Sequence, residues 1–320
     1  MLSTRRKLII AAGILVVLGA VFWAAALASS DFDIKNFGRA ELEEHTYDVS
    51  GTFRSIRIDA DTEVIGLMPS EDGHCRVVCL EEKDTGHEVA VESDVLTIRP
   101  VDNRKWTGHF GILAGEPRVS LYLPEKAYAE LVIKTDTGDI DIPADFSFES
   151  VSIRGSTADV SCLADVSGLA DIGLNTGDIK LSGLNAGEIK LSTTTGKIRA
   201  ESVACRGDVA LSVDTGGITL SDVSCKNLRS AGDTGDIELK NVLASGQFDI
   251  QTNTGDVRFE GSDATEIFVR TGTGEVSGTL LSDKVFIIDT DTGDVDVPRT
   301  VTGGRCEITT DTGDIEISVK

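Results

Sequence analysis

The most chemically suggestive feature of the chain is the tripeptide Asp-Thr-Gly, which aspartic proteases carry once per lobe so that two carboxylates share a proton. Its copies begin at Asp84, Asp136, Asp214, Asp233, Asp291 and Asp311. From Asp136 onward they recur within a regular repeat, and stacked repeats would bring no two copies face to face. The tripeptide therefore indicates a tight turn, in which Gly supplies a positive φ and Asp closes the bend, and it does not indicate proteolysis.

Acidic residues directly after the repeat glycine are a second source of chemistry, because eight of the ten repeats carry Asp or Glu there. Stacked carboxylates about 5 Å apart repel one another, and bound Ca²⁺ would remove that repulsion. The candidate ligands are Asp233, Asp236, Asp256, Asp291, Asp294, Asp311 and Asp314. Lys197 and Gly217 interrupt the column, and the nonapeptide of calcium-binding β-rolls is absent. We therefore favour solvated turn carboxylates and expect no cofactor, with calcium as the alternative.

Basic residues gather in the third and fourth repeats, although the chain as a whole has a net charge of −23. They are Lys180, Lys190, Lys197, Arg199 and Arg206. Such a group could hold an anionic cell-wall polymer, whereas mixed surface charge is its ordinary explanation. The net charge itself repels phosphate, so nucleic acid is excluded as a partner.

Catalytic and zinc-binding constellations are not expected in the repeats, because all four histidines precede them. They are His45, His74, His87 and His109. Cys75 and Cys79 lack the second cysteine pair that a zinc finger needs. Trp106, in the loop Asn103–Gly115, is either a binding contact or a cover for the N-terminal β region.

The repeat that positions these residues has a period of 19 or 20 residues. Thr precedes its central residue in all ten copies, and Ile or Val follows two residues after the centre. The central residues are Gly138, Ala158, Gly177, Gly196, Gly216, Gly235, Gly255, Gly274, Gly293 and Gly313. Apolar residues at even spacing on both sides predict two short strands joined by a bend. The sequence therefore predicts an all-β, parallel β-solenoid of about ten coils.

The domain boundaries follow from where the period holds. Residues 131–320 are predicted to be the regular solenoid, and residues 47–130 an irregular β cap or its first coils. The expected β runs in the cap are Phe53–Ile58, Glu63–Leu67, Arg76–Leu80, Glu88–Val91, Val95–Ile98 and Val119–Leu123. Sequential stacking would leave the strand after Gly313 as an open C-terminal edge, where we expect end-to-end self-association, another partner, or protection by charge.

The N-terminal region predicts a membrane anchor. Residues 1–7 form a basic, cytoplasmic segment, and residues 8–28 carry no charge over a length that spans a bilayer. Residues 29–46 are a polar spacer. The chain is thus predicted to be single-pass at the cell membrane, with an extracellular C-terminal domain. A signal peptide cleaved after Ala26-Leu27-Ala28 is the alternative.

Cys205 and Cys225 each follow a repeat glycine by nine residues, so they should stack on adjacent coils about 4.8 Å apart. A disulfide would fit that spacing and an exported domain. We favour two small buried side chains in an internal column.

The Thr-Gly-Asp-Ile/Val turns, together with Phe53–Ile58 and Leu121–Pro124, resemble the bacterial "putative adhesin" β-solenoid domain. The resemblance covers residues 47–320; it implies the solenoid and a preceding membrane helix, and it supplies no catalytic residues. We expect a non-catalytic binding or structural surface protein, whose partner is a cell-wall polymer or an envelope protein. The alternatives are a carbohydrate-active enzyme on a β-helix scaffold and an envelope-stress sensor or regulatory partner.

Overall fold

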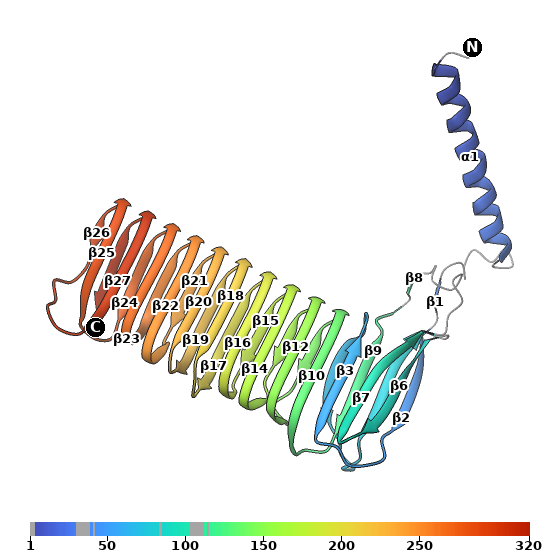
Figure 1. The fold of residues 1–320 in the computed structure, drawn as a ribbon, viewed down its shortest axis with the longest axis horizontal. Coiled ribbons are helices and arrows are strands. Elements are labelled where there is room, and N and C mark those ends of the chain that lie inside the picture. The colour runs from blue at the N-terminus through green and yellow to red at the C-terminus, as the bar shows by residue number, and fades with distance from the viewer. Residues whose placement is uncertain (1–3, 30–38, 41, 83–84, 103–111, 114) are drawn as a thin grey trace.

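The computed structural model describes residues 4–29, 39–40, 42–82, 85–102, 112–113 and 115–320. Coils of parallel strands stack along one axis, and a smaller β cap closes the N-terminal end of the stack (Figure 1). The predicted all-β parallel solenoid of about ten turns is confirmed. Residues 103–111, which include Trp106 and His109, and residues 83–84 lie outside the described residues.

Each coil places one strand on either side of its bend. The strands before the bend are β10 (Ala127–Thr137), β12 (Ser147–Thr157), β14 (Asp165–Thr176), β16 (Asn185–Thr195), β18 (Val209–Thr215), β20 (Leu228–Thr234), β22 (Leu243–Thr254), β23 (Val257–Thr273), β25 (Lys284–Thr292) and β27 (Gly304–Thr312). The strands after it are β11 (Ile140–Ile142), β13 (Val160–Cys162), β15 (Ile179–Ser182), β17 (Ile198–Cys205), β19 (Ile218–Cys225), β21 (Ile237–Lys240), the start of β23, β24 (Val276–Leu280), β26 (Val295–Asp296) and β28 (Ile315–Val319).

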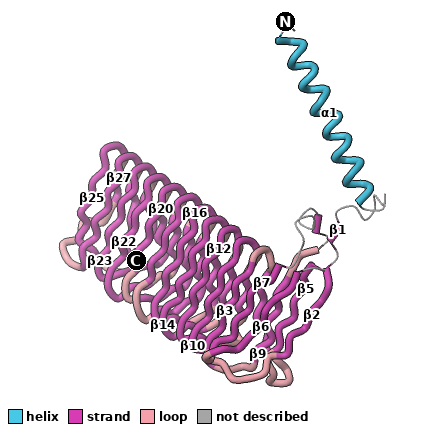
Figure 2. Tube along the Cα trace, turned by 45° about the vertical axis from the view of Figure 1, so that its right-hand side comes forward, coloured by secondary structure: helices cyan, strands magenta, loops and turns pink. Residues whose placement is uncertain are grey.

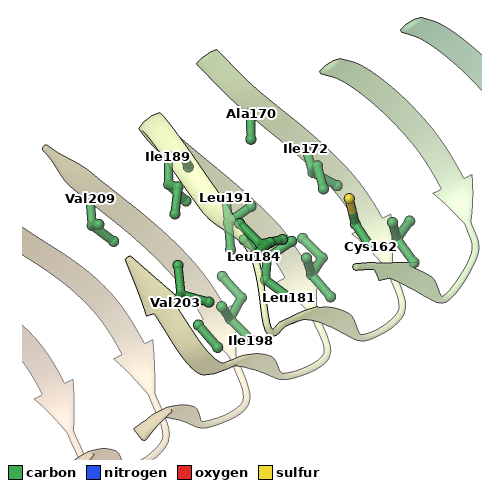
Figure 3. Packing of buried hydrophobic residues seen from close by; sticks show 14 of the residues in the cluster. Cys162, Ala170, Ile172, Leu181, Leu184, Ile189, Leu191, Ile198, Val203 and Val209 are labelled. Carbon is green, nitrogen blue, oxygen red and sulfur yellow. The ribbon is translucent and has the colours of Figure 1, made fainter. Parts of the chain in front are cut away.

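The core is the set of apolar columns that face each other inside the coils. Ile172, Ile189 and Leu191 from the strands before the bend pack toward Leu181 and Ile198 from the strands after it (Figure 3). These side chains are at most 1% exposed. Neighbouring coils keep the same register, with Ile172 beside Leu191 and Leu181 beside Ala200. Even spacing in the sequence therefore becomes a continuous apolar interior.

The bend explains the repeated Thr-Gly-Asp. Gly177 has φ +132°, and a Cβ there would lie 1.8 Å from the carbonyl oxygen of Ala158. The acidic residue that follows supplies an acceptor: Oδ1 of Asp159 accepts a hydrogen bond of 2.7 Å from the backbone amide of Asp178. Asp139, Asp178, Asp236, Asp256 and Asp314 accept the amide of an adjacent coil in the same way. The acidic column thus satisfies backbone donors at the bends.

The N-terminal cap begins with one more parallel coil and ends in antiparallel strands. β3 (Ser55–Ala60) pairs in parallel with β10, and β4 (Val64–Pro69) pairs with β11. The remaining strands are β1 (Arg39–Ala40), β2 (Leu42–Asp48), β5 (Arg76–Glu82), β6 (Thr85–Glu92), β7 (Val95–Asp102), β8 (Ile112–Leu113) and β9 (Arg118–Leu123). β5 lies antiparallel between β2 and β9, and β6 is antiparallel to β7. All six predicted β runs are confirmed, and β2 shortens the predicted spacer because it pairs with β5.

The last coils do not stack in sequence order, which corrects the expected open C-terminal edge. β27 lies between β23 and β25, and β28 lies between β24 and β26. Ile315 and Ile317, expected at the edge, are therefore buried. The outermost rung is β25–β26, which marks the far end of the stack in Figure 1. Its Ile287 and Val295 are each 48% exposed. Ile287 is on the outward side of β25, whereas Val295 belongs to an inward column and has no further coil of the described residues over it.

Helix α1 (Thr4–Ser29) precedes the β body (Figure 2). Its large apolar side chains between Ile14 and Trp23 are exposed around the helix, with Phe22 at 74%. No helix within the described residues combines the length and the apolar character that crossing a membrane requires.

Candidate binding face

A groove of about 610 Å³ runs across the outward face of the strands that precede the bends. It extends from the end of β3 over β10, β12, β14 and β16 to β18. Outward residues alternate with the buried columns on each strand. All five strands contribute the residues four and two positions before the centre, and β14 and β16 also contribute the residue six positions before it. The groove therefore displays side chains at a fixed spacing along the solenoid axis.

Small residues make the floor of the groove. Gly173, Ser192 and Ser212 occupy the position four residues before the centre in three successive coils. The same position holds Lys134 and Arg154 in the two coils before them. The change from long to short side chains hollows the face at coils three to five. The run of Gly and Ser at this position in three successive repeats is the sequence signal for the groove. The residues at the bends do not indicate it.

The walls of the groove are polar and carry both charges. Nη2 of Arg154 is 2.5 Å from Oδ2 of Asp171, so those two charges neutralise one another. Lys134 and Lys190 are exposed, and neither has an ion-pair partner among the described residues. Asp136, Asn175 and Asp214 add hydrogen-bonding groups. The lining holds five carboxylates against three basic side chains, so the arrangement offers hydrogen-bonding groups of both charges to a polar ligand. The two ammonium groups are the places where its anionic groups would bind.

The predicted basic group is divided between different parts of the coil. Lys190 faces the groove, whereas Lys180 and Arg199 are neighbours on β15 and β17, beyond the bend. Arg199 is 2.8 Å from Asp178, and Arg206 donates to the carbonyl of Ser167. The five residues therefore do not form one patch, because successive segments of a coil face different directions, and this agrees with mixed surface charge as their ordinary explanation. Of these five basic residues, Lys190 is the one that lines the groove.

The seven predicted calcium ligands lie at bends on four coils, those centred on Gly235, Gly255, Gly293 and Gly313. One carboxylate oxygen of Asp236 and one of Asp314 accept a hydrogen bond from the backbone amide of an adjacent coil. Asp233 accepts a hydrogen bond from the side chain of Asn253. Asp291 and Asp311 are neighbours because β25 and β27 pair. Among the described residues, the group of potential ligand atoms that comes together is a different one, in the cap. Calcium binding at the bends stays a prediction.

All six cysteines are buried and free. Cys205 and Cys225 follow the paired residues Ala204 and Ser224 on adjacent coils, as the favoured internal column predicts. Burial raises the pKa of the Cys225 thiol to about 12 and that of Cys162 to about 11. Neutral, enclosed thiols of this kind are packing residues.

Comparison with known proteins places this geometry among related folds. The family model "Toastrack DUF4097" matches residues 53–212 and 205–320. A putative adhesin from Parabacteroides merdae ATCC 43184 has a similar structure, with a TM-score of 0.50 and 13% identity over 76% of this chain and 98% of that one. A putative adhesin from Parabacteroides distasonis ATCC 8503 has a TM-score of 0.49 and 14% identity over 88% of this chain and 98% of that one. At such identities the likeness concerns the fold alone. No curated protein matches the chain in sequence.

Proposed function

The chain belongs to the Toastrack DUF4097 family, and we propose that it is an adhesin-like, non-catalytic surface protein whose lateral groove binds an anionic polymer of the cell envelope. The observation that carries this proposal is the groove itself, with its short floor and its two unpaired lysines, Lys134 and Lys190. The name of adhesin, given to a protein of the same fold, agrees with this role.

The periodic floor favours a polymer over a small molecule. Strands stack about 4.8 Å apart, so the five strands that line the groove together with the end of β3, namely β10, β12, β14, β16 and β18, span about 19 Å along the axis. A polymer lying along the axis would meet short side chains on three successive coils, at Gly173, Ser192 and Ser212. Its hydroxyl groups would bond to Asn175, Ser192 and Ser212, and its anionic groups would approach Lys134 and Lys190.

We also propose that α1 anchors the protein in the cell membrane, with the β body outside the cell. Two features support this location. Residues 8–28 carry no charge and follow a basic segment, and the described apolar side chains of α1 are exposed, as in a helix that another apolar phase must cover. Alkaline carbonate extraction of cell membranes tests the anchor. Recovery of the full-length chain in the pellet supports it, and a soluble chain that begins near residue 29 would show a cleaved signal peptide.

The groove is tested by binding to immobilised polygalacturonate as a defined polyanion, with neutral dextran as the comparison. We expect wild type to bind the polyanion and to release it at high salt. The double substitution Lys134→Ala/Lys190→Ala should weaken binding about tenfold or more, whereas Lys226→Ala, another exposed lysine outside the groove, should not. Equal binding by both variants would overturn the groove as the site.

The same groove distinguishes binding from turnover. Asp136, Asp171 and Asp214 place carboxylates in it, which a carbohydrate-active enzyme would require. Release of reducing ends from envelope polysaccharide by wild type, lost in Asp171→Asn, would replace the binding proposal with an enzymatic one. We expect wild type to release none.

A further inference from the structure

The N-terminal cap encloses a cluster of polar side chains that the groove does not use. Cys79 and Glu81 face inward from β5, His87 faces inward from β6, and His45 stands opposite Cys79 on β2. These strands form the outer part of the cap in Figure 2. The side chains of Glu81 and His87 are each 2% exposed, and Cys79 is fully buried. The cluster shares no residue with the groove, so the inference below stands apart from the proposed function.

Glu81 is the centre of the cluster. Its Oε2 is 2.5 Å from Nδ1 of His87, and its Oε1 is 2.7 Å from Nδ1 of His45. One ligand atom from each of Cys79, Glu81 and His87 lies within 4.8 Å of the other two. Glu63 approaches from the β3–β4 bend, with Oε1 3.7 Å from Nε2 of His87. Its other oxygen accepts the amides of Asp61 and Thr62, which fixes the carboxylate in place.

Hydrogen bonding within the protein does not satisfy this cluster. Nε2 of His87 and Nδ1 of His45 are buried and make no hydrogen bond to the described residues, although Nδ1 of His45 lies close to Glu81. A buried ion pair of Glu81 with an imidazolium would account for Nδ1 of His87, but it would leave Nε2 facing Glu63 beyond hydrogen-bond distance. Buried polar atoms without partners are rare in folded proteins, and a missing ion is one of their ordinary explanations.

We propose that Cys79, Glu81 and His87 bind a zinc ion, with a water molecule as the fourth ligand and His45 beside Glu81. A thiolate, a carboxylate and an imidazole nitrogen are donors that Zn²⁺ takes in tetrahedral sites, and the mixture of sulfur and nitrogen disfavours Ca²⁺ and Mg²⁺. Glu63 is then a positioning residue, since its carboxylate lies 3.7 Å from Nε2 of His87 and its charge favours an N–H on that side of the ring. His45, whose side chain is 44% exposed, provides the entrance.

Such a site would give the cap a cross-link between two strands that do not pair with each other. Glu81 comes from β5, which pairs with β2 and β9, and His87 comes from β6, which pairs with β7. Zinc would join β5 and β6 around one atom. The site is therefore predicted to stabilise the N-terminal end of the solenoid.

The experiment is a calorimetric titration of the full chain, stripped of metal by a chelator, with Zn²⁺ alone. We expect one zinc ion per chain. His87→Gln and Cys79→Ser should each weaken binding at least about 100-fold, because ligand loss costs no less than loss of an outer hydrogen-bond partner. The matched controls are His74→Gln, an exposed histidine, and Cys75→Ser, a buried cysteine on the same segment; both should bind as wild type does. Circular dichroism verifies the fold of each variant.

A second measurement does not depend on the ligand variants folding. Co²⁺ bound in place of Zn²⁺ should show the visible bands of tetrahedral coordination and a thiolate-to-metal charge-transfer band in wild type and in Cys75→Ser. Glu63→Gln should keep both spectra and weaken binding about tenfold, as a positioning residue would. Absence of stoichiometric zinc binding, absence of the thiolate band, or equal losses in the control variants would each overturn the site.

Discussion

The backbone amide of Asp178 donates a hydrogen bond of 2.7 Å to Oδ1 of Asp159 in the preceding coil. This hydrogen bond shows how the repeated Thr-Gly-Asp turn stabilises the stacking of adjacent coils. At six bends the backbone amide of the residue after the centre donates to the carboxylate at the same position of an adjacent coil, which satisfies that donor. Solenoid stability should therefore depend on the acceptor, and not on the negative charge.

Asp159→Ala removes that acceptor and should lower the free energy of unfolding by about 1 kcal/mol, the ordinary net value of a hydrogen bond. Asp159→Asn keeps a carbonyl oxygen in the same place and should recover most of the loss. Urea denaturation followed by circular dichroism measures both. An Asn variant as unstable as the Ala variant would show that charge, and not the acceptor, matters.

Gly177→Ala should destabilise the solenoid by about 2–3 kcal/mol or more, because a positive φ and a direct clash with the Ala158 carbonyl act together. Gly183 is the matched control: its φ is +66°, but a Cβ there meets nothing within 4 Å. Gly183→Ala should cost only about 1 kcal/mol for its backbone conformation. Equal losses in thermal denaturation would contradict a role for close stacking at the bends.

Calcium should leave the melting temperature unchanged relative to a chelator, because the turn carboxylates already accept amides of adjacent coils. Differential scanning calorimetry with millimolar Ca²⁺ or EGTA tests this expectation. An increase in melting temperature with Ca²⁺ that is smaller in Asp236→Asn would support calcium binding at the bends. An increase of the same size in this variant would indicate that calcium binds elsewhere.

The open strand edge at the far end of the solenoid belongs to β25 and β26, because the C-terminal strand β28 lies between two other strands. Ile317→Asp should cost about 3 kcal/mol or more, because residue 317 is only 3% exposed. Ile287→Asp, at 48% exposure, should leave stability nearly unchanged and should reduce any concentration-dependent self-association, since the edge of β25 away from β27 is open to another chain. Sedimentation velocity measures the association. Equal association by wild type and Ile287→Asp would remove β25 from the contact.

Alkaline pH should destabilise the fold through its buried thiols. Burial raises the pKa of Cys162 from 9.0 to about 11 and that of Cys306 from 9.0 to about 12. An acid whose folded-state pKa is raised binds its proton more tightly when folded, so its contribution is complete below pH 9 and is lost as pH rises through the folded value. The denaturation midpoint should fall above pH 9 and should fall less in Cys162→Ala. A flat profile would contradict this.

Much of the fold was accessible from the sequence, because each coil repeats the same local rule. The spacing of Ile189, Leu191 and Ile198 around Gly196 predicts two strands with their apolar sides inward, and the structure confirms it. The order of the last coils was not accessible, because β25 and β27 carry the same pattern and either could pair with β23. Local periodicity specifies a coil and leaves its neighbour unspecified.

The candidate sites were less accessible for two different reasons. The groove depends on a column of short outward residues such as Ser192 and Ser212, which contribute to no motif. The cap cluster depends on antiparallel pairing that brings His45 beside Cys79 and on the proximity of β5 and β6, which brings His87 to Glu81. Such pairings follow no repeat, so the spacing of these residues in the chain does not indicate their contact.

The central claim, that the lateral groove is the binding face, is tested most directly by photocrosslinking in intact cells. A photoreactive amino acid at Ser212, exposed in the groove, is compared with one at Glu238, exposed on β21 beyond the bend. We predict adducts with envelope polymer or its associated protein at position 212, reduced by Lys134→Ala/Lys190→Ala, and none at position 238. Adducts of equal yield at both positions, or none at position 212, would contradict it.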